Sequence, residues 1–152
     1  MFDCLPKRAR SSNPRPARKD AGVAGLVATG TKRTLLLLTL DEQLAQIVTP
    51  LLDPAWTLIR QNGHYTAPAT FAHPNIRIVL LDDDSVAESD RGWLLNRIRK
   101  NAADASLIYV AGNHSEDGER LARGSGAHYY VSKPLSPELF GHVLKSFIRA
   151  RG

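Results

Sequence analysis

The sequence predicts a doubly wound α/β fold built on a five-stranded parallel sheet. Short apolar runs recur along the chain, segments with a helical spacing of apolar residues separate them, and the two patterns alternate five times from residue 33 onward. The runs are nearly continuous, which is typical of strands covered by helices on both faces. Regular alternation of strand and helix is the pattern of a parallel α/β sheet.

Five segments have the length and composition of strands. They are residues 34–40, 56–61, 76–81, 106–111 and 128–132. The second of them, WTLIRQ, alternates in side-chain character and is therefore expected at an edge of the sheet. Asn62 and Gly63 follow it and should turn the chain.

Helices are expected between and after these strands. They begin at Asp41, lie weakly within residues 64–74, cover residues 93–100 and 116–123, and follow Ser136. Asp41 and Ser136 are residue types that cap helix N-termini, and Pro50 should bend or shorten the first helix. Trp93 is among the apolar residues that mark the helix over residues 93–100, and Leu139 opens the apolar face of the last helix.

The positive charge of the chain lies at its amino terminus. The formal net charge is +5, and residues 1–32 hold seven basic and two acidic residues, so that residues 33–152 are balanced with 13 of each. Residues 1–32 are rich in Arg, Pro, Ser, Gly and Ala, and we expect a disordered basic tail because so few large apolar residues are present. A functional alternative is an arm that binds nucleic acid or another anionic surface.

Simple features exclude several classes of protein and site. No apolar run reaches the ~20 residues of a membrane span, so we expect a protein without membrane segments. The basic N-terminal residues are not followed by a hydrophobic stretch, which argues against a secretory signal and favours the cytoplasm. Cys4 is the only cysteine, so an internal disulfide and a cysteine-based zinc site are excluded. The histidines show no metal-ligand spacing.

Functional groups of doubly wound sheets gather beyond the carboxyl ends of the strands. In this sequence those ends are residues 39–42, 82–84, 111–113 and 132–134. They resemble the receiver domain of two-component response regulators. IVLLD, residues 78–82, looks like the strand that presents the phospho-accepting aspartate, and GAHYYVSKP, residues 126–134, looks like the family's Gly-Ala, switch-aromatic and Lys-Pro positions.

The resemblance covers roughly residues 33–151 and implies a flavodoxin-like (βα)5 sandwich for residues 33–152. It implies that Asp82 is the phospho-acceptor, that Lys133 binds the phosphoryl group, and that Tyr130 is the switch aromatic. It also implies a cis peptide bond before Pro134.

Three positions depart from the family pattern. Thr39 and Leu40 align with the two adjacent acids that normally hold Mg²⁺, and the register that would place Asp41 there turns polar residues of the following helix toward the core. Ala111 stands where a Ser or Thr hydroxyl normally meets the phosphoryl group. Because Mg²⁺ and Lys offset the charge in phosphoryl transfer, we expect very slow or absent phosphorylation, as in a degenerate pseudo-receiver.

We therefore expect a different role for each of the three consecutive aspartates. Asp82 is read mainly as a relic acid that forms an ion pair with Lys133. Asp84 is the candidate to rebuild a Mg²⁺ site together with Asp82, because alternate side chains near a strand end share one side. Asp83 should point away.

The sequence thus favours an atypical stand-alone receiver domain in bacterial signal transduction, with no enzymatic activity and no required cofactor. The chain stops after its last helix, so output is expected through a protein partner, such as a histidine kinase, or through a homodimer. The expected contact face comprises the helix over residues 116–123, the strand over residues 128–132 and the last helix, and includes Tyr130, Glu138 and Lys145.

Two alternatives stay open. One is a working single-domain response regulator, phosphorylated on Asp82 within a phosphorelay and using Asp84 in an altered metal site. The other is nucleic-acid binding through residues 1–32, which predicts strong salt dependence.

Overall fold

The computed structural model describes residues 32–63, 65 and 68–151, so the expected basic tail lies outside the described residues except for Lys32. Five parallel strands form one sheet in the order β2-β1-β3-β4-β5. The strands are β1 (Arg33–Leu38), β2 (Trp56–Gln61), β3 (Ile76–Asp82), β4 (Ser106–Ala111) and β5 (Ala127–Ser132). The expected doubly wound α/β fold is confirmed, with β2 at an edge of the sheet.

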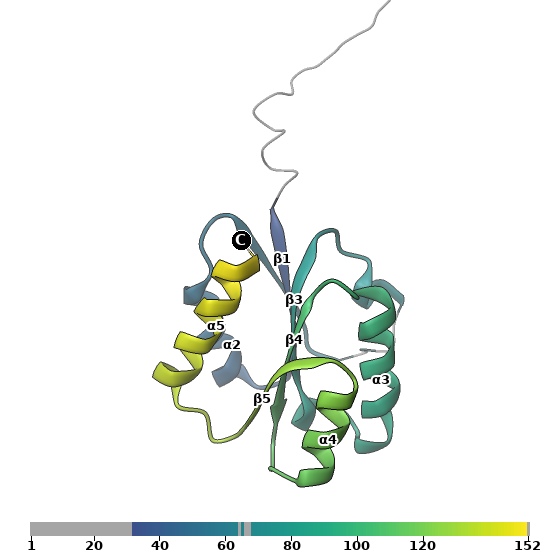
Figure 1. The fold of residues 1–152 in the computed structure, drawn as a ribbon. Helices are drawn as coiled ribbons and strands as arrows, with labels where there is room; N and C mark the ends of the chain where they lie inside the picture. Colours follow the sequence, from purple (N-terminus) through teal and green to yellow (C-terminus); the bar gives the residue numbers. More distant parts are fainter. Residues whose placement is uncertain (1–31, 64, 66–67, 152) are drawn as a thin grey trace, which may run out of the picture. The chain divides into compact units, whose positions relative to one another are not determined.

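In the described part of the chain, four α-helices cover the sheet. They are α2 (Glu42–Val48), α3 (Glu88–Asn101), α4 (Glu116–Gly124) and α5 (Pro137–Arg151). Helices α2 and α5 lie on one face of the sheet, and α3 and α4 lie on the other (Figure 1). The Asp41 side chain caps α2 by accepting a hydrogen bond from the Gln43 N–H, and α2 ends at Val48, where the 3₁₀ turn η2 (Thr49–Leu51) with Pro50 follows. These two boundaries agree with the sequence predictions.

Alternating residues of the central strands fill two separate cores. In β1, Leu35 and Leu37 pack in the cluster beneath α2 and α5, whereas Leu36 and Leu38 pack in the cluster beneath α3 and α4. Residues 78–81 of β3 divide in the same way and are fully buried. Both faces of these strands are covered, and this accounts for their continuous apolar sequence.

The first strand is shorter than expected, and its end shapes the functional edge. β1 ends at Leu38, two residues before the expected Leu40. The Thr39 N–H still bonds to the Gln61 carbonyl at 3.1 Å, and the Thr39 hydroxyl then accepts from the Asp41 N–H at 2.8 Å. That short hydrogen bond turns the chain from the sheet into α2 within three residues.

Other differences concern helix limits and exposed apolar residues. The weak helix expected within residues 64–74 is reduced in the described residues to a single 3₁₀ turn, η3 (Pro68–Phe71). α3 begins at Glu88, earlier than expected, because its first turns carry polar residues without an apolar period.

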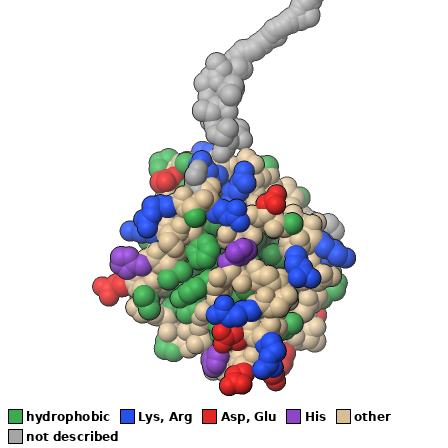
Figure 2. All heavy atoms as spheres, in the orientation of Figure 1, with side chains coloured by type: hydrophobic (Ala, Val, Ile, Leu, Met, Phe, Trp, Pro, Cys, Tyr) green, Lys and Arg blue, Asp and Glu red, His purple; other side chains and the backbone are tan. Residues whose placement is uncertain are grey.

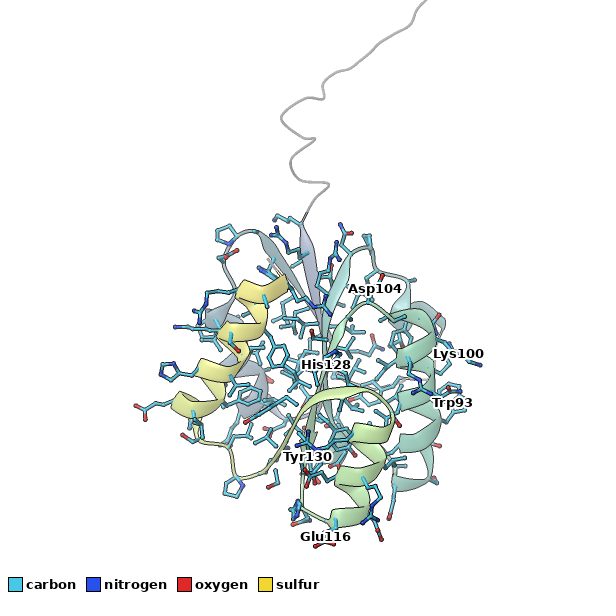
Figure 3. All side chains as sticks on the ribbon, in the orientation of Figure 1. Trp93, Lys100, Asp104, Glu116, His128 and Tyr130 are labelled. Carbon is cyan, nitrogen blue, oxygen red and sulfur yellow. The ribbon has the colours of Figure 1, made fainter. Side chains whose placement is uncertain are left out.

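Trp93 is 44% exposed and points outward from α3 (Figure 3), where the Arg97 guanidinium lies 5.0 Å from the ring centre. Leu139 is 63% exposed and not part of the core.

Among the described residues, no helix combines the length and apolar character needed to cross a membrane.

Candidate functional site

The carboxyl ends of β1, β3 and β5 bring the expected site residues together. Asp82, the last residue of β3, is 0% exposed. Thr39 follows β1 and is also fully buried, and Lys133 follows β5 with its side chain partly covered. The peptide bond between Lys133 and Pro134 is cis, in agreement with the resemblance. Ala111 ends β4 and is buried without contributing a hydroxyl.

The Asp82 carboxylate has hydrogen-bond donors on both oxygens. Its Oδ2 atom accepts from Thr39 Oγ1 at 2.7 Å, from Lys133 Nζ at 3.0 Å and from Ser85 Oγ at 3.2 Å. Its Oδ1 atom accepts from the Asp84 N–H at 3.2 Å. A buried carboxylate needs such partners, because an uncompensated charge is costly away from water. The expected contact between Asp82 and Lys133 is therefore present, together with two hydroxyl donors.

Lys133 contacts three carboxylates at once. Its Nζ atom lies 3.0 Å from Asp41 Oδ2, 3.0 Å from Asp82 Oδ2 and 3.4 Å from Asp84 Oδ2. Asp82 and Asp84 thus share one side, as the alternation of side chains predicted. Asp41 was placed at the functional edge with residues 39–42, but it was assigned to the helix cap and a register that would make it a metal-holding acid was rejected. Its contact with Lys133 was therefore not predicted.

Ser85 is a second residue that sequence reasoning missed. Its Oγ atom accepts from the Leu40 N–H at 2.7 Å and donates to Asp82 Oδ2. The hydroxyl therefore ties the loop after β1 to the loop after β3. The Leu40 side chain takes no part in this contact and is 59% exposed.

Asp83 turns away from Lys133, but it points into the protein. It is 6% exposed, its Oδ2 atom accepts from the Tyr109 hydroxyl at 2.8 Å, and its Oδ1 atom accepts from the Gly112 N–H at 2.7 Å. Arg91 of α3 lies 3.9 Å from Oδ2. Asp83 thus points away from the Lys133 cluster, as expected, and it holds the end of β4 against the loop after β3, a role that the sequence did not indicate.

Tyr130 is buried between β5 and α4 (Figure 3) and belongs to an aromatic contact. Its ring stacks on Tyr109 with centroids 5.6 Å apart and planes 14° apart. Its hydroxyl lies 3.3 Å from His114 Nδ1. Although Ala111 supplies no hydroxyl, a different chain of contacts runs from Asp83 through Tyr109 to Tyr130.

Comparison with known proteins supports the architecture. A response regulator from Thermotoga maritima has a TM-score of 0.65 at 18% identity, with coverage of 78% of this chain and 98% of that chain. The signal receiver domain of an HD domain-containing protein from Pseudomonas fluorescens has a TM-score of 0.64 at 21% identity, covering 79% and 97%. The chain has the receiver-domain fold.

A third structure with the receiver fold, ascribed to pilus assembly in Burkholderia thailandensis, has a TM-score of 0.62 at 15% identity and covers 77% of this chain and 98% of that one. No protein-family model matches the sequence, and no curated protein matches it. At identities this low, the structural similarity shows the receiver fold alone and assigns no role to any individual residue.

The receiver fold implies Mg²⁺ at this edge, but the residues present do not fit the ion. Mg²⁺ requires several oxygen ligands in near-octahedral geometry. Leu40 offers no side-chain oxygen, and the Lys133 ammonium group already lies among the three nearest carboxylates. No group of three His, Cys, Asp or Glu residues in the described part of the chain is placed to hold a metal. The Asp82–Asp84 metal site therefore stays a prediction from the sequence, and these contacts do not favour it.

The contacts between Lys133 and its carboxylate partners lower the pKa of Asp41 and raise the pKa of Lys133. Burial works to raise the pKa of Asp41, but hydrogen bonds from Lys133 and the Gln43 N–H outweigh it, and the pKa lies below its ordinary 3.8. Burial works to lower the pKa of Lys133, but hydrogen bonds to Asp41 and Asp82 outweigh it, and the pKa lies above its ordinary 10.5. Both groups are therefore held in their charged forms.

These shifts predict how stability depends on pH. The raised pKa of Lys133 contributes stability that is present below pH 10.5 and is lost as the pH rises through the folded-state value. The lowered pKa of Asp41 contributes stability that is present above pH 3.8 and is lost as the pH falls through its folded-state value. The free energy of unfolding, measured with urea at different pH values, should therefore be nearly constant between these two pH limits. In Lys133→Met, the alkaline loss should be smaller than in the wild type, and an equal loss would contradict the assignment.

Proposed function

We propose that this chain is an atypical receiver domain of bacterial signal transduction, located in the cytoplasm, that binds a protein partner without phosphorylation of Asp82. The observation that supports the proposal is the state of Asp82 Oδ2, which accepts from Thr39, Ser85 and Lys133 within 3.2 Å. Three donors engage the lone pairs of Oδ2, so attack by this oxygen on phosphorus would first have to break hydrogen bonds, and among the described residues Oδ1 is held by the Asp84 N–H alone. The protein would therefore hold one conformation at this edge.

Charge supports the same proposal. Phosphoryl transfer to a carboxylate brings two anions together, and catalysis depends on cations that offset the developing charge. Lys133 is already neutralised by Asp41, Asp82 and Asp84. Three carboxylates and one ammonium group leave a net formal charge of −2, which would repel an incoming phosphoryl donor.

A phosphorylation assay tests the proposal. The full chain is incubated with Mg²⁺ and acetyl phosphate, or with Mg²⁺ and beryllofluoride, beside an active receiver domain as positive control. We expect no added phosphoryl mass and no amide shifts around Asp82 in two-dimensional NMR spectra, because three donors hold Asp82 Oδ2 and the surrounding carboxylates repel the phosphoryl donor. A stable adduct that disappears in Asp82→Ala would overturn the proposal and favour the phosphorelay alternative.

That alternative has one observation in its favour. Asp84 is 53% exposed on its side chain and shares Lys133 with Asp82, so movement of the lysine would leave carboxylates facing one another. A working response regulator would need this rearrangement before Mg²⁺ could bind. The nucleic-acid alternative concerns residues 1–32, which lie outside the described residues except for Lys32, and it stays a prediction from the sequence.

The face formed by α4, β5 and α5 is the surface we propose for a signalling partner, such as a histidine kinase, or for a second copy. Figure 2 shows hydrophobic side chains between α5 and β5, with basic and histidine side chains at the border of this area. Tyr129, Val131 and Phe147 are only partly buried against the core here. Such an apolar area with charged borders is typical of a protein interface.

A further inference from the structure

A groove of about 750 Å³ lies beside the carboxylate cluster, between α2 and the segment that leads into α5. Its volume falls within the range of sites that hold a ligand or a few residues of a peptide. The residues that line it are Asp41, Gln43, Leu44, Gln46, Ile47, Asp84, Gly112, Asn113, Lys133, Pro134, Leu135 and Pro137.

The groove has an acidic end and an apolar wall. Asp41 and Asp84 lie at the acidic end next to Lys133, where the cluster described above carries a net formal charge of −2. Ile47 and Leu135 form part of the apolar wall and are only partly buried against the core. An occupant that matches both parts must combine positive charge with apolar side chains.

Asp84 is the carboxylate with capacity for such a ligand. Among the described residues, the only polar partner of its side chain is Lys133, at 3.4 Å. Gly112 leaves space for it, because a Cβ atom at Gly112 would collide with the Asp84 carboxylate. Asp41, by contrast, already accepts from the Gln43 N–H and from Lys133.

Exposed leucines adjoin the groove in the sequence. Leu40 precedes Asp41, and Leu139 follows Pro137 by two residues. They are the two most exposed large hydrophobic residues in the part of the chain that the structure describes. Exposed apolar side chains are typical of an interaction surface, and these two follow or precede groove-lining residues in the sequence without lining the groove themselves.

We propose that this groove binds a linear segment of a partner protein in which arginine or lysine residues alternate with apolar residues. This inference rests on the proposed function, because it names the kind of partner that a receiver without phosphorylation would bind. The cationic group contacts Asp84, and the apolar side chains pack on Ile47 and Leu135. Gln46 and Asn113, which also line the groove, are placed to hydrogen-bond the peptide backbone.

The test uses the full chain and a fluorescent peptide of alternating leucine and arginine as the probe. Two matched peptides replace either every arginine with glutamate or every leucine with serine. We expect saturable binding of the leucine–arginine peptide in fluorescence anisotropy, with NMR shifts at Gln46, Ile47 and Leu135. Neither matched peptide should bind measurably, and added salt should weaken binding because the charge contact is exposed.

Two groove variants and two control variants locate the site. Asp84→Asn and Gln46→Lys should each weaken binding about tenfold, the first by removing a charge-assisted hydrogen bond and the second by repulsion. Asp117→Asn on α4 and Asn96→Lys on α3 make the same chemical changes at exposed positions outside the groove and should leave affinity unchanged.

Several results would overturn the proposal. These are equal binding of the glutamate peptide, equal effects of the control variants, equal affinity for arginine amide alone, and self-association of the chain through the groove in place of peptide binding. Absence of peptide binding together with absence of an Asp82 adduct rejects the groove and leaves the proposed function standing. An adduct at Asp82 rejects the proposed function, whereas the peptide measurements report on the groove itself.

Discussion

Replacing Lys133 with methionine is expected to lower the free energy of unfolding by about 3 kcal/mol at neutral pH, because a buried carboxylate then loses its cation. Asp82 is fully buried, and its two hydroxyl donors, Thr39 and Ser85, carry no charge. Asp41 and Asp84 also lose the ammonium group that lies between them and Asp82. Methionine keeps most of the length of the side chain, so the change removes mainly the charge.

Urea unfolding followed by circular dichroism measures this effect. Lys145→Met serves as the control, because Lys145 is an exposed lysine on α5. The double variant Asp82→Asn/Lys133→Met should recover a large part of the loss, since the uncompensated charge is gone. If Lys133→Met were no more destabilising than Lys145→Met, the three ion pairs would contribute little and the fixed state of the site would be in doubt.

Replacing Tyr109 with phenylalanine is expected to lower the free energy of unfolding by about 2 kcal/mol, because Asp83 then loses its hydroxyl donor in a buried position. Only the Gly112 N–H and Arg91, at 3.9 Å, would remain near the Asp83 carboxylate. Burial, together with the hydrogen bond to Asp83, raises the pKa of Tyr109 in the wild type. Its phenol should therefore stay protonated at pH values that ionise exposed tyrosines.

Thermal and urea unfolding measure the stability, and NMR of the aromatic rings measures the link to Tyr130. Tyr129→Phe is the matched control on the neighbouring strand, since the Tyr129 hydroxyl has no hydrogen-bond partner among the described residues. We expect altered Tyr130 ring shifts in Tyr109→Phe and little change in Tyr129→Phe. Unchanged Tyr130 shifts would show that the stacked rings do not transmit the change at Asp83.

The fold could be predicted from the sequence because its strands are buried on both faces. Residues 106–111 match β4 in full, and residues 56–61 match β2, since continuous or alternating apolar patterns report burial directly. The sequence misleads where an apolar residue is exposed in the fold. Leu139 and Trp93 lie at exposed positions of their helices although each adjoins apolar residues, and spacing alone does not decide which side of a short helix faces the sheet.

The candidate site was predictable in part. The proximity of Asp82, Asp84 and Lys133 follows from topology, because carboxyl ends of parallel strands meet at one edge. The roles of Asp41, Ser85 and Asp83 depend on loop conformation after β1 and β3, which side-chain hydrogen bonds determine. Asp83 turns inward because Tyr109 and Gly112 offer two donors in the interior, and neither donor can be inferred from the neighbours of Asp83 in the sequence.

The three carboxylates around Lys133 have a consequence for how such a protein would carry information. Its counter-ion is covalently part of the chain, so the conformation of this edge should be the same whether a cell is rich or poor in divalent metal and in phosphoryl donors. Under the proposed function, the presence of such a protein, and not a phosphoryl group on it, would be the signal. Its strength would then depend on the number of copies in the cell, which synthesis, degradation and competition for the partner would set.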